Sequence, residues 1–163
     1  MGNKTLVYKT KVTQNINESL KHLQRLNNAF AELSKKYSLP IDKKSYQSIP
    51  SSNQELAYSD QIIYRFSKLQ DVMGAKLFKA LLLYQGENID RPFLDILNNL
   101  EKMHIIDVEE WFEIRDLRNE IAHDYEDNES MAIEILNSIY ELKDELENII
   151  NNIRKILTTW DYQ

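Results

Sequence analysis

Apolar residues recur along most of the chain at spacings of three, four and seven. That spacing is typical of helices that bury one face. In the first such stretch Pro40 ends the pattern, because a proline disfavours a helical residue before it. The pattern predicts five helices, over residues 15–37, 60–84, 92–103, 107–123 and 131–159. Short connections between most of them predict an all-α fold, an antiparallel bundle of four to five helices.

Two stretches fall outside this pattern. Residues 1–14 lack a strong period, and we expect a loose, flexible or extended N-terminal arm there. Residues 38–58 contain two prolines and a Ser-Ser-Asn cluster, which predicts a long loop. Neither flank of that loop could bury a core alone, so we expect one helical domain over residues 15–163.

Several residues mark the ends and contacts of the helices. Ser59 or Asp60 could cap the second helix, and Pro92 suits the first position of the third. Asp107 with Glu110 resembles a capping box that opens the fourth. Gly74 interrupts the second helix, and we interpret it as a place where another helix approaches closely.

Composition narrows the classes of function. The chain has 163 residues, three glycines, three prolines and no cysteine, so a thiolate metal site and a cysteine nucleophile are excluded. Its three histidines, His22, His104 and His123, lack metal-ligand spacing, and we expect no metal and no cofactor. The sequence contains no apolar run long enough for a membrane span and no signal-like start, so a cytoplasmic protein is the default expectation.

The formal net charge is −6. Proteins held on nucleic acid mainly by bulk electrostatics are usually basic. A nuclease with a local basic cleft is still compatible with this charge, and a protein partner is a further expectation.

Chemistry-bearing residues concentrate at the end of the fourth helix. Arg118, Asn119, His123 and Tyr125 lie within eight residues. On a helix, Arg118 and His123 stand about 140° apart around the axis and about 7.5 Å along it, so they converge only obliquely within one chain. Two antiparallel copies across a twofold axis would form a richer cleft, which favours a dimer.

This set of residues suits RNA cleavage without a metal. A histidine can move a proton near neutral pH, and an arginine can hold a phosphate through two hydrogen bonds. Asn119 could orient the substrate or the imidazole. Attack of a ribose 2′-OH on the adjacent phosphate would leave a 2′,3′-cyclic phosphate.

Plainer interpretations also fit these residues. His123 could cap the C-terminus of its helix, where a cation is favourable. Arg115 and Arg118 could pair with Glu113, Asp116 or Glu120 on a solvated surface, and for Arg115 that is the preferred interpretation.

The pattern Arg118-x4-His123-x-Tyr125 resembles the signature of the HEPN family (higher eukaryotes and prokaryotes nucleotide-binding), in the form found in HepT-like toxins. Residues 93–106 are similar to the short helix and turn that precede this signature, and residues 64–71 are similar to the family's second helix. The resemblance covers roughly residues 15–160, and only the motif is specific.

The resemblance implies an all-α homodimer with ribonuclease activity against cellular RNA. Arg118 and His123 would be catalytic, and Asn119 would be the supporting polar residue. The implied partner is a minimal nucleotidyltransferase antitoxin that attaches AMP to Tyr125. A bulky anionic nucleotide beside the cleft would block RNA and compete for Arg118.

Two other functions remain open. Some relatives are described as non-catalytic substrate-binding subunits of nucleotidyltransferases, and the motif could hold a nucleotide in that role. A purely structural helical dimer is the third interpretation, in which replacing Arg118 or His123 would change no phenotype.

Overall fold

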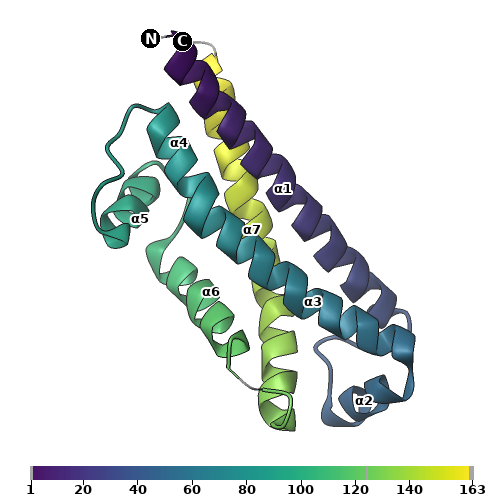
Figure 1. Cartoon of the computed structure of the whole chain (residues 1–163). Helices are drawn as coiled ribbons and strands as arrows, with labels where there is room; N and C mark the ends of the chain where they lie inside the picture. The colour runs from purple at the N-terminus through teal and green to yellow at the C-terminus, as the bar shows by residue number, and fades with distance from the viewer. Residues whose placement is uncertain (1, 124, 162–163) are drawn as a thin grey trace.

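The computed structural model describes residues 2–123 and 125–161, and over these residues it is helical with no strand. Figure 1 shows two long helices, α1 (Gly2–Ser34) and α7 (Glu129–Asp161), that lie side by side near the chain ends. No helix in the described ranges is long and apolar enough to cross a membrane. The all-α prediction is confirmed.

A nearly continuous helical rod packs along α1 and runs back in the opposite direction (Figure 1). It consists of α3 (Asn53–Val72), a π-helical turn at Met73–Leu77 and α4 (Phe78–Tyr84). Next come two shorter helices, α5 (Phe93–Lys102) and α6 (Val108–Ile121). The rod buries large side chains between α1, α6 and α7, among them Ile62, Phe66, Leu69, Met73, Leu77 and Phe78.

The N-terminal segment differs from the prediction. We expected a loose or extended arm over residues 1–14, but α1 is helical from Gly2 onward. Lys9 Nζ donates to Asp161 Oδ1 at 2.9 Å, which ties the start of α1 to the end of α7. Val12 is buried. The first part of α1 is therefore helical and contacts α7, although its sequence shows no strong helical period.

The predicted loop at 38–58 also differs. It contains α2 (Lys43–Ser48), a 3-10 turn (Ile49–Ser51) and the first two turns of α3. The cap of α3 is Ser52 and not Ser59 or Asp60, since the Ser52 hydroxyl accepts from Glu55 N. Asn137 of α7 exchanges two hydrogen bonds with the backbone of Ile41, which anchors the segment.

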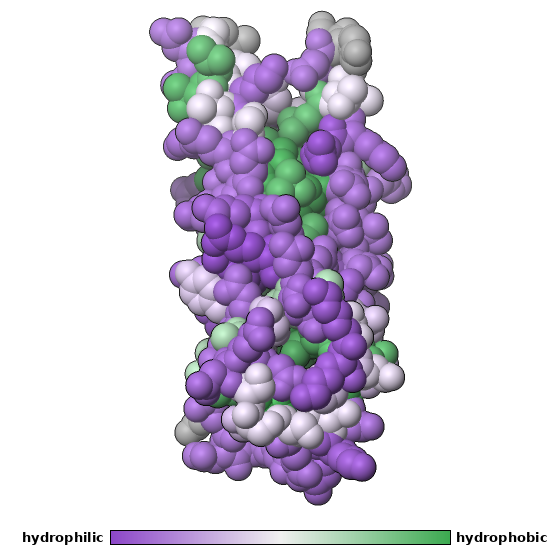
Figure 2. All heavy atoms as spheres, turned by 90° about the vertical axis from the view of Figure 1, so that its right-hand side faces the viewer, coloured by the Kyte–Doolittle hydropathy of each residue, from purple (hydrophilic) through white to green (hydrophobic). Residues whose placement is uncertain are grey.

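Figure 2 shows that the side of the molecule on the right of Figure 1 is mostly polar, with a narrow apolar strip in its upper half. Leu6 and Val7, near the start of α1, are exposed at 63% and 51%. The core itself lies deeper, between α1, α3 and α7.

Candidate functional site

The helix that carries the motif, α6, begins and ends as its sequence predicts. Asp107 caps its start by accepting from Glu110 N at 3.1 Å. It ends at Ile121, where the backbone N–H of His123 donates to the carbonyl of Glu120 at 3.1 Å. The motif therefore occupies the last turn of α6 and the turn that follows.

A close contact between α3–α4 and α6 sets the position of the motif. A Cβ added to Gly74 would lie 3.1 Å from a ring carbon of Trp111, which is fully buried. The Trp111 ring also packs edge-on against Phe78, with the centroids 4.7 Å apart. The prediction that Gly74 admits a neighbouring helix is confirmed.

Arg118 is held by a carboxylate of α3. Its Nε donates to Asp71 Oδ1 at 3.1 Å and its Nη2 donates to Asp71 Oδ2 at 3.2 Å. The guanidinium uses one edge in this pair, and no other hydrogen bond or ion pair within the described ranges engages Nη1. Because the Arg118 side chain is 28% exposed, its outer edge can reach a ligand.

His123 and Asn119 are both exposed. Within residues 2–123 and 125–161, neither side chain has a hydrogen-bond or ion-pair partner. The suggestion that the His123 side chain caps α6 therefore has no hydrogen bond to support it. The structure brings Arg118 to Asp71 and leaves Asn119 and His123 free on the open side of the helix end.

Arg115 does not pair with the carboxylates beside it, contrary to the preferred interpretation of the sequence. Its guanidinium lies 5.7 Å from the centre of the Phe93 ring on α5. Arg118 likewise bonds across to α3 and not to a neighbour on α6. Both arginines therefore belong to the flank of α6 that faces α3 and α5.

Tyr125 is half-buried and packs against the core. Burial raises the pKa of its hydroxyl, and the nearby carboxylates of Glu126 and Asp60 raise that pKa further, with a smaller contribution from Tyr46. The hydroxyl is consequently neutral at physiological pH. A base would have to remove its proton before the oxygen could act as a nucleophile.

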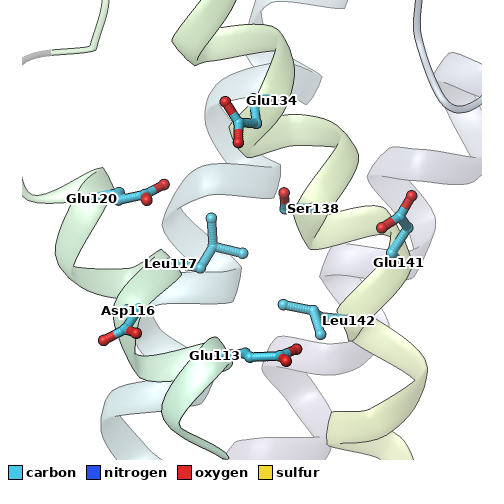
Figure 3. A pocket seen from close by; sticks show the side chains of 8 residues that line it. All are labelled: Glu113, Asp116, Leu117, Glu120, Glu134, Ser138, Glu141 and Leu142. Carbon is cyan, nitrogen blue, oxygen red and sulfur yellow. The ribbon is translucent and has the colours of Figure 1, made fainter. Parts of the chain in front are cut away.

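The opposite flank of α6 is acidic. A groove of about 300 Å³ separates it from α7, and Figure 3 shows Glu113, Glu120 and Glu134 reaching into the space between the two helices. Asp116 and Glu141 complete a lining of five carboxylates. Across the described ranges, no group of three or more His, Cys, Asp or Glu residues is arranged to hold a metal ion.

No protein-family model, curated protein or solved structure matches this chain.

Sequence reasoning missed Asp71 as a site residue. Asp71 precedes Arg118 by 47 residues, and nothing in the spacing of either residue indicates that they meet. The available signal was a polar stripe on the second helix, at Tyr64, Lys68 and Asp71, opposite the apolar stripe.

Proposed function

We propose that this chain is a HEPN-type ribonuclease toxin that cleaves RNA without a metal ion, acting in the cytoplasm as a homodimer. The observation that carries the proposal is the hydrogen bonding of the Arg118 guanidinium. Asp71 fixes one edge of its guanidinium and leaves Nη1 and the outer edge for a phosphate. His123 and Asn119 lie unburied on the same helix end.

In the proposed reaction, the ribose 2′-oxygen attacks the adjacent phosphorus and the bond from phosphorus to the 5′-oxygen breaks. The imidazole of His123 moves a proton, either from the 2′-OH or to the departing 5′-oxygen. Arg118 stabilises the extra negative charge on the pentacoordinate phosphorus. In a dimer, His123 from each copy would take one of the two proton-transfer roles. Arg118 and His123 of a single copy would then not have to converge on the same phosphate.

We further propose that a minimal nucleotidyltransferase silences the toxin by attaching AMP to Tyr125. The tyrosine oxygen would attack the α-phosphorus of ATP, and pyrophosphate would leave. The phenol must lose its proton in this step, and we assign the base that takes it to the nucleotidyltransferase. The adenylate would then lie beside His123 and compete with RNA for Arg118.

A second candidate is a non-catalytic subunit that binds a nucleotide for a nucleotidyltransferase. The observation that favours it is the bidentate Asp71 pair, which lowers the positive charge that Arg118 presents to RNA. Cleavage that depends on His123 separates the two candidates.

The test is expression of the chain alone, without a nucleotidyltransferase, in cells whose growth and RNA integrity are followed. We expect the wild type to arrest growth and fragment RNA, and His123→Ala to do neither. The matched control is His104→Asn, because His104 has a φ of 58°, where asparagine is tolerated. Intact RNA with the folded wild-type protein would favour the nucleotide-binding subunit.

A further inference from the structure

An aromatic ring with two cations near it stands on the exposed side of α3. Tyr64 is 50% exposed, so one face of its ring can be reached from solvent. The Arg65 guanidinium lies 5.1 Å and the Lys68 ammonium 5.8 Å from the ring centre. Ring and cations together have the chemistry of a nucleotide site, in which a base stacks and a phosphate pairs.

This cluster borders the motif on α6. The α3 helix contacts the motif at two points: Asp71 pairs with Arg118, and Asp60 lies close enough to Tyr125 to raise its pKa. The two helices thus run in opposite directions. Asp60 and Asp71 are eleven residues apart, about 16 Å along a helix, and Tyr64 and Lys68 fall between them. The side of α3 that carries Tyr64 and Lys68 therefore lies alongside the motif, from Arg118 towards Tyr125.

The charges around α6 direct a polyanion to this side. The flank that faces α7 contributes Glu113, Asp116 and Glu120 to a groove to which α7 adds two more carboxylates. The flank that faces α3 carries Arg118, which pairs with Asp71, and Lys68 lies beyond this pair on α3. A phosphate backbone would be repelled more strongly by the first flank than by the second.

We infer that Tyr64 is a base-stacking position for single-stranded RNA, with Lys68 contacting a neighbouring phosphate. The inference rests on the proposed ribonuclease function and names the form of its substrate. Stacking needs an unpaired base, since the bases of a duplex are already stacked on one another. The site would therefore select unpaired over paired RNA.

The test measures binding of a fluorescent single-stranded RNA, and of its duplex, to protein carrying His123→Ala so that the probe stays intact. We expect the single strand to bind more tightly. Tyr64→Ala should weaken single-strand binding about five- to a hundredfold, and Tyr64→Phe should keep most of it. Lys68→Ala should weaken binding by a smaller factor and lower the salt dependence by about one counterion. Leu94→Ala is the control, because Leu94 is 48% exposed on α5.

The outcomes separate the inference from the proposed function. If the wild type cleaves RNA and Tyr64→Ala binds and cleaves normally, the inference fails and the ribonuclease stands. Equal binding of single strand and duplex would also overturn it. If Tyr64→Ala instead converts a dimer to a monomer in solution, Tyr64 is an interface residue and the inference fails. If the folded wild type neither binds nor cleaves RNA, the proposed function fails and the inference falls with it.

Discussion

The two flanks of α6 present opposite charges within a single helix of 14 residues. The flank towards α3 and α5 carries Arg115 and Arg118, each engaged by a group on another helix. The flank towards α7 carries Glu113 and Glu120, which face more carboxylates across the groove. A net charge averages this contrast away, so the sign of a whole chain says little about where a polyanion can bind.

The largest expected effect is that of Arg118→Ala on cleavage. Loss of a group that stabilises the transition-state charge should lower the single-turnover rate by roughly a hundred- to a thousandfold. Stability should change by no more than about 1 kcal/mol, because Asp71 is 45% exposed and can be solvated once unpaired. Glu120→Ala on the acidic flank is the control. Equal losses in both variants would show that the contrast between the flanks is irrelevant to cleavage.

The next largest effect concerns the packing of α6 against α3 and α4. In Gly74→Val the added side chain would collide with the buried Trp111 ring, so we expect unfolding free energy to fall by about 1–3 kcal/mol. Gly2→Ala should be neutral, because a Cβ added at Gly2 would meet no atom within 4 Å. Urea denaturation measures both. An unchanged urea midpoint of unfolding for Gly74→Val would mean that Trp111 of α6 does not pack against Gly74 as described.

A smaller effect should appear as a pH dependence of stability at the far side of α3. The His22 ring is buried, and its Nδ1 lies 2.9 Å from Arg65 Nη1. Burial first, and then the charge of Arg65, lower the pKa of His22, whereas Glu18 acts in the opposite direction. The neutral ring is thus favoured in the folded state. The neutral His22 ring contributes fully to the free energy of unfolding above its ordinary pKa of 6.5. This contribution is lost as the pH falls from 6.5 through the lowered pKa of the folded state.

Urea denaturation of the wild type and His22→Gln between pH 7.5 and pH 5.5 checks this sign. We expect the wild type to lose stability on acidification, and His22→Gln to lose less, since glutamine can accept from Arg65 without titrating. A wild type that gains stability towards pH 5.5 relative to the variant would show that His22 is favoured in its charged form.

The smallest effect is expected in the acidic groove. The double variant Glu120→Gln, Glu134→Gln removes two negative charges that face the space between α6 and α7. RNA should bind a few-fold more tightly at low salt, and the gain should vanish at high salt because exposed charges are screened. Binding measured at two ionic strengths decides this. Weaker binding would mean that RNA contacts the groove itself.

Local signals predicted the parts of the fold that local chemistry determines. Asp107 caps α6 and Gly74 meets Trp111 because capping and close approach depend on single residues and their immediate positions. The start of α3 was misplaced because the serines before it resemble a loop, although Ser52 is the cap. The helical N-terminus escaped prediction because its tertiary contacts are distant in sequence; the Lys9–Asp161 pair, for example, spans 152 residues.

The candidate site was likewise predictable from the sequence only in part. Residue types and their order in the motif are readable from the chain alone, and they sufficed to select Arg118, Asn119, His123 and Tyr125. They could not reveal that Asp71 fixes Arg118, since that pair depends on how α3 and α6 pack. The proposed cleft between two copies would depend on packing between chains, which the spacing of Arg118 and His123 can suggest but not specify.

The most direct test of the central claim is end-group analysis of RNA incubated with the purified chain in excess EDTA. We predict fragments that end in a 2′,3′-cyclic phosphate and a 5′-OH from the wild type and from His104→Asn, and none from His123→Ala. Cleavage that requires an added divalent cation, or that persists at the wild-type rate in His123→Ala, would contradict the account.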